Sequence, residues 1–348
     1  MILFNVAYGR ASGGLRAMAE AYESILSNSS TTVYGFRVGS KGSTKQSGLR
    51  FIPSSGHFNP VGCLLALFYL FQLRPDVVIC HCTRSLSLFF LPCRLLGIPT
   101  VGVTHNDKLQ RFTKADYMIA FSSVLESKLL DLGFARERIR ILPNPVSSSI
   151  GDVSKKRFSD RSDVTSLRLG FLARLEARKG AHLAIETLSC LEGRSIDSHL
   201  LLGGEGEEKV SLLEQVSSLR LEERVDLLGW VNDPDTFFSE IDLFLVPSNY
   251  ESFGLTIVEA FARRVPVITS RFYCFADNFF TDRVNCVLAA DCSAESFAEA
   301  VQWCVENPDQ VEAITNRAES DFYEHFAADK VAEKLHGFFK EIVETTRQ

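Results

Sequence analysis

Residues 247–260 of the chain read Pro-Ser-Asn-Tyr-Glu-Ser-Phe-Gly-Leu-Thr-Ile-Val-Glu-Ala and follow an apolar run at 241–246. An apolar strand, a polar turn and a helix in this order predict one strand–turn–helix unit of a parallel sheet. Gly254 stands where the backbone comes close to another group. The amides of Gly254, Leu255 and Thr256 lack acceptors in a helix that begins there, so they form a ready site for a diphosphate.

Two glutamates flank this turn: Glu251 precedes the predicted helix and Glu259 lies within it. Carboxylates beside a phosphate repel it, so we expect both to hold neutral hydroxyls, those of a sugar or a ribose. A structural alternative has Ser252 capping the helix and both glutamates solvated. The spacing alone leaves the two interpretations open.

The same alternation of apolar strands and helices runs through most of the chain, which predicts α/β domains with doubly wound parallel sheets. A polar stretch rich in Ser, Asp and Lys at 147–166 divides two such series and predicts a linker. The expected strands are 2–7, 31–38, 76–82, 100–104, 117–121, 140–142, 167–172, 199–202, 225–228, 243–246 and 266–269. The expected helices are 13–26, 61–73, 86–96, 181–191, 207–219, 234–240, 255–262, 293–305 and 329–346.

Length and composition agree with two folded domains. The chain has 348 residues, of which 46% are hydrophobic and 23% charged, which excludes disordered, collagen-like and coiled-coil proteins. At roughly 100–200 residues per domain, this length predicts two domains. Two doubly wound domains imply a cleft between them, with ligands at the carboxyl ends of the strands.

The net charge of −6 conceals two halves of opposite sign. Residues 1–150 hold 16 Lys and Arg against 8 Asp and Glu, a charge of +8, whereas residues 151–348 carry −14. The acidic total argues against a nucleic-acid partner. The basic first half suits an anionic acceptor or an anionic membrane surface.

Membrane insertion is not expected, because the longest apolar stretch, 61–73, is shorter than the ~20 residues a bilayer core requires. A buried core helix is one interpretation of this stretch, and a helix partly presented to a membrane surface is the other. The nine cysteines form no CxxC pair, which is typical of reduced thiols in a cytoplasmic protein. The triplet Cys80-His81-Cys82 lacks a second ligand pair, so no metal site is expected.

Residues 251–259 resemble the Glu-x-Phe-Gly-Leu-x-x-x-Glu signature of family 4 glycosyltransferases (glycosyl transferases group 1), retaining enzymes with the GT-B fold. Further segments are similar to family segments in the same order. They are Asn144-Pro145, Gly170 to Leu175 with Arg178-Lys179-Gly180, Leu200 to Gly206, and Val225 to Val231. The resemblance implies a GT-B arrangement of two Rossmann-like domains that face each other across a cleft. It implies an acceptor-binding domain at 1–150, a nucleotide-sugar-binding domain at 151–325, and a C-terminal helix at 326–348 that crosses back to the first domain.

The resemblance also assigns roles to single positions. It places the donor diphosphate at Arg174, Lys179, Gly254, Leu255 and Thr256. It places the ribose and the transferred sugar at Glu259, Phe253 and the catalytic Glu251, and the nucleotide base near Gly204, Gly229, Trp230 and Val231.

In the first domain, the resemblance assigns a catalytic role to His105, which follows an apolar strand and faces the sugar. It also makes Gly13-Gly14 a glycine loop, although a tight turn explains two glycines equally well. The sequence departs from the family at Arg263-Arg264-Val265-Pro266 and at 272–277, which leaves the details of the sugar pocket open.

The expected activity is therefore transfer of a sugar, with retention, from a nucleoside-diphosphate sugar to a glycan or lipid-linked acceptor. The charge of +8 and the apolar helices of the first domain favour an acceptor at the cytoplasmic face of a membrane, such as bacterial lipopolysaccharide or another envelope glycan. Family analogy implies that neither metal nor cofactor is required. UDP, GDP and ADP remain open as the nucleotide. The alternatives are a soluble acceptor and a non-catalytic nucleotide-sugar-binding subunit. A Rossmann dehydrogenase lacks support, because no GxGxxG follows the first strand.

Overall fold

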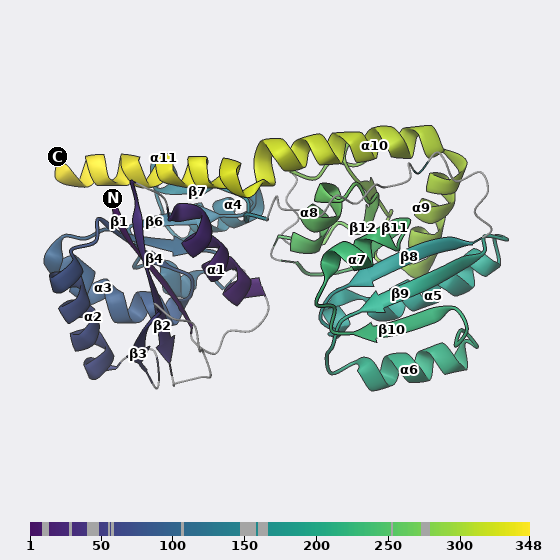
Figure 1. The fold of residues 1–348 in the computed structure, drawn as a ribbon, viewed down its shortest axis with the longest axis horizontal. Coiled ribbons are helices and arrows are strands. Elements are labelled where there is room, and N and C mark those ends of the chain that lie inside the picture. Colours follow the sequence, from purple (N-terminus) through teal and green to yellow (C-terminus); the bar gives the residue numbers. More distant parts are fainter. Residues whose placement is uncertain are drawn as a thin grey trace. The chain divides into compact units, whose positions relative to one another are not determined.

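A computed structural model describes most of the chain. The described residues are 1–8, 14–27, 30–39, 49–54, 56, 59–105, 108–146, 158, 166–251, 253–272 and 279–348. They divide into two compact units (Figure 1). Unit 1 consists of Met1–Pro145 and Ala327–Gln348, and unit 2 consists of Val146–Phe326.

Unit 1 is built on a seven-stranded sheet in the order β3-β2-β1-β4-β5-β6-β7, in which every pair of neighbours is parallel. The strands are β1 (Ile2–Tyr8), β2 (Thr32–Gly39), β3 (Arg50–Pro53), β4 (Val77–Cys80), β5 (Thr100–Val103), β6 (Tyr117–Ala120) and β7 (Ile139–Ile141). The helices are α1 (Gly14–Leu26), α2 (Pro60–Leu73), α3 (Thr83–Leu96), α4 (Ser123–Asp131) and α11 (Ala328–Arg347).

Consecutive residues of β1 face opposite layers of helices. The ring of Phe4 packs edge-on against Phe89 of α3 at 6.4 Å, whereas the Asn5 side chain donates to the carbonyl of Ala19 in α1 at 2.8 Å. This two-residue period is that of a strand covered on both faces, which is why the strands of the sheet are apolar almost throughout.

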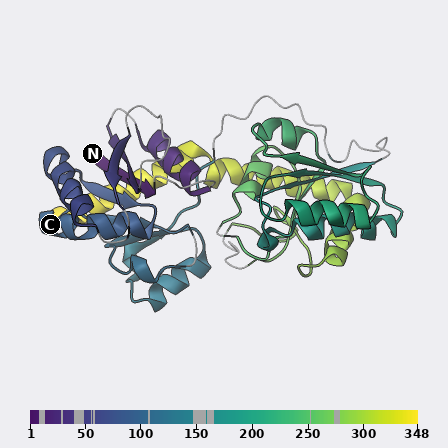
Figure 2. The ribbon, with the colours of Figure 1, turned by 90° about the horizontal axis from the view of Figure 1, so that it is seen from below.

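Unit 2 repeats the architecture with a six-stranded parallel sheet in the order β10-β9-β8-β11-β12-β13. Figures 1 and 2 show helices on either side of its strands. The strands are β8 (Leu167–Leu172), β9 (Ser198–Gly203), β10 (Val225–Gly229), β11 (Leu243–Val246), β12 (Val267–Thr269) and β13 (Val287–Leu288). The helices are α5 (Ala181–Glu192), α6 (Lys209–Ser218), α7 (Pro234–Ser239), α8 (Leu255–Ala262), α9 (Ala294–Glu306) and α10 (Pro308–Asp321).

Both sheets have the strand order of a doubly wound fold, which confirms the predicted fold class. The first strand of each unit lies inside its sheet: β1 has β2 and β4 as neighbours, and β8 has β9 and β11. Connections leave such a strand toward opposite sides, and ligands of this fold bind at the carboxyl edge beside it. The loops after β4, β5, β8 and β11 are therefore where functional side chains are expected.

Helix α2 corrects one expectation of the sequence. A buried core helix was one interpretation of 61–73, yet only Gly62, Ala66 and Leu70 of this helix are buried. Phe68 and Phe71 are 58% and 67% exposed. Apolar residues occur all around this helix, so the hydrophobic pattern could not show which side would face the sheet.

The C-terminal region contains elements that the sequence did not predict. Helix α10 follows α9 after Asn307, and a π-helical turn, Phe322–Phe326, follows α10. Helix α11 belongs to unit 1, where Glu341 pairs with Arg140 at 2.5 Å and Arg347 pairs with Asp76 at 2.9 Å. Strand β3 and helix α4 were also missed, because both are too short to show a clear hydrophobic period.

Candidate active site

Two loops meet at the carboxyl edge of the sheet in unit 2. The loop after β11 lies against the turn that precedes α5, and the amide of Asn249 donates to the carbonyl of Arg178 at 3.1 Å. Gly180 lies at the contact with a φ of +76°, and a Cβ there would be 2.1 Å from the carbonyl oxygen of Pro247. Only glycine combines this backbone conformation with so close an approach. The contact joins the predicted diphosphate segment to the predicted sugar segment.

Lys179 and Glu251 form an ion pair within this contact. The Lys179 Nζ lies 2.5 Å from Glu251 Oε1, and both side chains are 13% exposed. The hydroxyl of Ser248 also donates to Glu251 Oε1, at 3.1 Å. A carboxylate held by a cation and a hydroxyl is fixed in position, as a group that meets a substrate must be.

Helix α8 begins as the sequence predicts. Gly254 precedes its first residue with a φ of +88°, so the chain turns sharply and the amides of Leu255 and Thr256 begin the helix. First-turn amides have no acceptor inside a helix and favour an anion. Phe253 is buried at 1% exposure among Phe279, Phe280 and Phe326, so only its backbone can meet a ligand.

Glu259 lies one turn further along α8, and burial raises the pKa of its carboxyl group above the ordinary value. The guanidinium of Arg263 lowers that pKa by a smaller amount. Arg263 itself binds Asp235, at 2.7 Å, and the carbonyl of Glu259, at 2.9 Å. Within the described part of the chain, no donor binds the Glu259 carboxylate, so it can accept hydrogen bonds from ligand hydroxyls.

Arg174 follows β8 and extends into solvent, with a side chain that is 53% exposed. Its guanidinium pairs with Glu176, whose other oxygen accepts from Arg178 Nε at 2.7 Å. One carboxylate is thus shared by two guanidinium groups. The excess positive charge at this edge can neutralise a diphosphate.

The predicted base-binding residues lie at the ends of β9 and β10. The amide of Gly204 donates to the carbonyl of Gly229 at 2.7 Å. Gly204 has a φ of +139°, and a Cβ there would lie 1.8 Å from the carbonyl oxygen of Ala173, the residue before Arg174. Val231 is partly buried, whereas Trp230 is 61% exposed. The two glycines therefore place this turn beside the residues that follow β8.

In unit 1, His105 lines a pocket of about 450 Å³ at the carboxyl ends of β4 and β5. Leu15, in the first turn of α1, also lines it. Burial lowers the pKa of His105 to about 4, so the imidazole is neutral near neutral pH. Gly14 opens α1. Gly13 lies outside the described residues, so the glycine loop stays a prediction.

The sequence did not single out His81 as a site residue, and yet its ring lines the same pocket as His105. His81 Nδ1 lies 3.0 Å from His105 Nε2, and its Nε2 lies 2.6 Å from Asn5 Oδ1. A signal was available, because both histidines end consecutive strands, and neighbouring parallel strands bring their carboxyl ends together.

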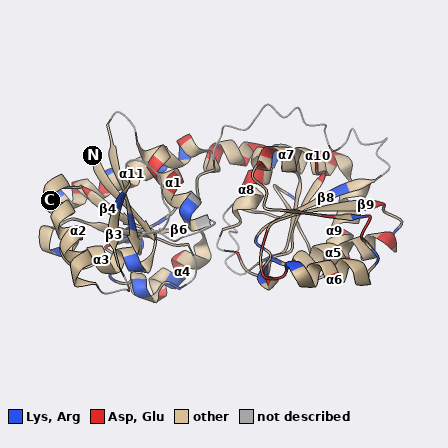
Figure 3. Ribbon diagram, turned by 60° about the horizontal axis from the view of Figure 1, so that its bottom comes forward, with Lys and Arg blue, Asp and Glu red and all other residues tan. Residues whose placement is uncertain are grey.

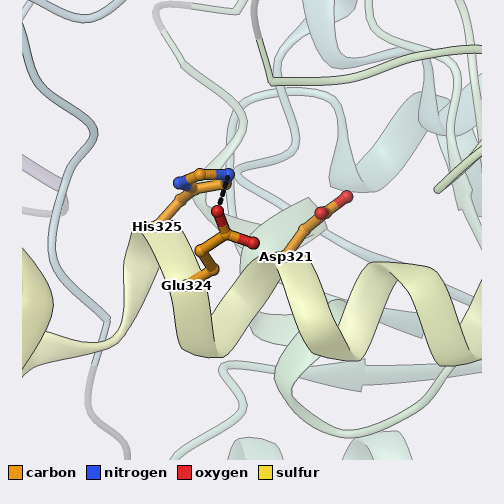
Figure 4. Close-up of side chains that lie close together, drawn as sticks. All are labelled: Asp321, Glu324 and His325. Atoms are coloured by element: carbon orange, nitrogen blue, oxygen red, sulfur yellow. Dashed lines mark ion pairs between the residues drawn. The ribbon is translucent and has the colours of Figure 1, made fainter.

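Figure 4 shows another group of candidate ligands, Asp321, Glu324 and His325, at the end of α10. Asp321 accepts from Asn285 Nδ2 at 2.7 Å and pairs with Arg317 Nε at 2.8 Å, while His325 lies 3.7 Å from Glu324. Because the carboxylate of Asp321 is already bound by two side chains, we interpret it as a structural anchor of α10.

Comparison with known proteins agrees with this geometry. Residues 152–321 match the family model Glycosyl transferases group 1, and residues 31–149 match Glycosyltransferase Family 4. The chain is 26% identical over 267 residues to the lipopolysaccharide core biosynthesis glycosyltransferase LpsE of Rhizobium meliloti, covering 75% of this chain and 74% of LpsE.

Two further proteins match nearly the whole chain. The GDP-mannose-dependent alpha-(1-6)-phosphatidylinositol dimannoside mannosyltransferase of Mycobacterium tuberculosis is 26% identical over 93% of both chains. The crystal structure of Anabaena Alr3699/HepE in complex with UDP superimposes with a TM-score of 0.81 at 19% identity, over 98% of this chain and 99% of HepE. With two doubly wound units and both family models matched in order, the chain belongs to the family 4 glycosyltransferases (glycosyl transferases group 1) and has the GT-B fold.

Proposed function

We propose that unit 2 binds a nucleoside-diphosphate sugar at the carboxyl edge of its sheet. The single observation that carries this proposal concerns Glu259, a partly buried carboxylate to which no described residue donates. It lies in a helix whose first amides are open. A ligand that joins an anion to neighbouring hydroxyls, as a nucleoside diphosphate does, matches both features. HepE was solved with UDP, while the mycobacterial relative depends on GDP-mannose, so the base is left to experiment.

The transfer proceeds, in our proposal, with retention of the anomeric configuration. The bond between the anomeric carbon and the diphosphate oxygen breaks, and the acceptor oxygen binds the same face of that carbon. The acceptor proton passes to the departing diphosphate. Arg174, Lys179 and the first amides of α8 stabilise the charge that develops there, so the protein's own donors can take the part that a metal plays elsewhere. Glu251 holds the transferred sugar.

We propose that unit 1 binds the acceptor, a lipid-linked or anionic envelope glycan of the lipopolysaccharide type. LpsE acts in lipopolysaccharide core biosynthesis, and the mycobacterial relative acts on a phosphatidylinositol mannoside. The C-terminal segment 327–348 contains four basic and four acidic residues, so unit 1 keeps the charge of +8. Such an excess attracts anionic substrates and anionic membrane surfaces.

The surface of α2 and α3 supports a membrane-facing position of unit 1. Helix α2 has no charged residue, and the charges of α3 are Arg84 and Arg94 (Figure 3). We use the term apolar ridge for the exposed apolar residues of the two helices, which are Val61, Leu64, Phe68, Phe71, Leu91, Leu95 and Leu96. Such a ridge beside arginines suits the interface of an anionic bilayer. None of the helices described is long and apolar enough to cross a membrane.

A panel of UDP-, GDP- and ADP-sugars tests the donor assignment. We expect one nucleotide to be released in the presence of a lipopolysaccharide or lipid-linked glycan acceptor, and the new glycosidic bond to keep the donor's anomeric configuration by NMR. Transfer should continue in the presence of a metal chelator. If no sugar nucleotide of the panel is turned over, the proposed activity is wrong, and an inverted product contradicts retention alone.

Sedimentation with phosphatidylglycerol vesicles tests the membrane assignment. We expect binding at low salt that weakens as salt rises, and loss of binding in the double variant Phe68→Ser/Phe71→Ser. The matched control is Val210→Ser/Leu213→Ser, since these residues of α6 in unit 2 are also exposed, at 67% and 49%. Failure of the unmodified protein to sediment at low salt would favour a soluble acceptor.

A further inference from the structure

A chain of hydrogen bonds in unit 1 begins at a buried arginine. Arg37, at the end of β2, is 3% exposed and donates to Glu23 Oε1 at 2.7 Å and to Glu23 Oε2 at 3.3 Å. A guanidinium can only donate hydrogen bonds, so both Glu23 oxygens act as acceptors in this bidentate pair.

Glu23 in turn fixes the orientation of a buried amide. Asn5 Nδ2 lies 3.0 Å from Glu23 Oε1 and 2.8 Å from the carbonyl oxygen of Ala19. Both partners are acceptors, so a flipped amide would direct its oxygen at two oxygens and lose both bonds. Asn5 Oδ1 must therefore face the other way, toward His81.

The orientation of Asn5 decides which nitrogen of His81 carries a proton. His81 Nε2 lies 2.6 Å from Asn5 Oδ1, which only accepts, so Nε2 bears the hydrogen. His81 is 1% exposed, and burial holds its pKa well below the ordinary value, with smaller contributions from electrostatic coupling to His105 and Arg37. The ring is therefore neutral, and its Nδ1 has a lone pair.

The same reasoning determines which ring nitrogen of His105 is protonated. Its Nε2 lies 3.0 Å from the bare Nδ1 of His81, so Nε2 of His105 must be the donor. Since the ring of His105 is also neutral, its Nδ1 is left unprotonated. No described residue donates to that atom.

We propose that Arg37, Glu23, Asn5 and His81 form a positioning relay that holds His105 as the Nε2–H tautomer and presents Nδ1 to the ligand as a hydrogen-bond acceptor. The group it recognises is a hydroxyl donor, such as a sugar hydroxyl, and a carbonyl or phosphate oxygen would be rejected. This assignment of a ligand rests on the proposed function, whereas the tautomer rests on the hydrogen bonds alone.

Histidine-selective ¹⁵N NMR of the unmodified protein tests the tautomer, because the chemical shifts distinguish protonated from bare ring nitrogens. We expect both His81 and His105 to have a protonated Nε2 and a bare Nδ1 at neutral pH, with no sugar nucleotide present. A protonated Nδ1 on either ring would overturn the relay. The measurement needs no folded variant and no substrate.

Three variants test the function of the relay. His81→Phe removes both ring nitrogens, whereas His81→Gln keeps one donor for Asn5 and one acceptor for His105. Tyr22→Phe is the control, because the Tyr22 ring packs edge-on against His81 at 4.9 Å while its buried hydroxyl has no partner in the described structure.

We expect His81→Phe to lower kcat/KM for nucleotide release from the sugar-nucleotide panel by about tenfold, the worth of one neutral hydrogen bond. In the NMR spectrum of this variant, His105 should no longer be held as the Nε2–H tautomer, and both neutral tautomers should be populated. His81→Gln should restore most of the activity, and Tyr22→Phe should change neither readout. Equal losses in His81→Phe and His81→Gln would overturn the relay. If the unmodified protein turns over no sugar nucleotide, the proposed function fails, and the NMR result still decides the tautomer.

Discussion

The Lys179 Nζ lies 2.5 Å from Glu251 Oε1, although 72 residues separate the two positions in the sequence. Without a ligand, the cation assigned to the diphosphate and the carboxylate assigned to the sugar neutralise each other. A diphosphate that enters must compete with Glu251 for Lys179. The two residues should therefore affect nucleotide affinity in opposite directions.

Glu251→Gln should leave nucleotide affinity unchanged or higher, because Lys179 becomes free to meet the diphosphate. Transfer should fall by about a hundredfold or more, the usual effect of losing a charged group from the reaction centre. Lys179→Ala should weaken nucleotide binding by about ten- to a hundredfold, the worth of one charge-assisted hydrogen bond. Calorimetry with UDP and GDP, alongside transfer rates, measures both. Equal losses of affinity in the two variants would contradict the competition.

Arg174→Ala should lower nucleotide affinity by about tenfold, because one of the cations at the carboxyl edge is lost. Arg168→Ala is the matched control. Arg168 lies at the other end of the same strand, β8, in an exposed ion pair with Glu240 at 3.2 Å. An exposed pair contributes little, so this variant should bind nucleotide like the unmodified protein. Similar losses in both variants would show a general electrostatic effect.

Glu259→Gln should bind nucleotide about ten- to a hundredfold more weakly, because an amide replaces a charged acceptor of ribose hydroxyls. The melting temperature should be equal or higher. The raised pKa means that the folded state disfavours the ionised carboxyl, so this group costs the unmodified protein stability as pH rises above the ordinary carboxyl range. Thermal unfolding at several pH values checks whether the variant gains stability while it loses nucleotide affinity. A Glu259→Gln protein that is less stable than the unmodified protein near neutral pH would contradict this expectation.

Gly254→Ala should destabilise unit 2 by about 1–2 kcal/mol, since alanine resists a left-handed conformation. Its Cβ would also lie 2.9 Å from Ile257 Cδ1. Gly337→Ala is the control, because a Cβ at this exposed position in the middle of α11 meets nothing within 4 Å. We expect Gly337→Ala to gain about 0.5–1 kcal/mol in denaturant unfolding. If Gly254→Ala leaves the free energy of unfolding unchanged, the left-handed conformation at Gly254 is not what requires a glycine before α8.

The pair formed by His81 and His105 should make unit 1 sensitive to acid. In the unfolded chain His105 takes up a proton near its ordinary pKa of 6.5, but in the folded protein only near 4. Between these values the unfolded state binds more protons, so the free energy of unfolding falls as pH falls from 6.5 toward 4. His105→Leu should flatten the decline in this window. Unchanged acid sensitivity in that variant would contradict burial as its cause.

The elements nearest the predicted site are also those that the sequence located best. The strand at 243–246 and the helix at 255–262 have their predicted bounds, because an apolar run and a helical pattern are separated there by one polar turn. Helix α10 was missed, since it is polar over much of its length and only a few of its residues face the core. Local pattern predicts an element when its buried face is continuous in the sequence.

The sequence by itself determined the alternation of strands and helices, the division into two domains, and the motif that leads to the family. These features depend on residues close together in the chain, so spacing and residue type are sufficient. The partners of His81, the pairing of Lys179 with Glu251 and the exposed face of α2 were decided only by the tertiary structure. Each depends on which strands become neighbours and which loops their ends bring together, and the free energy of those contacts is gained only when the whole sheet has formed.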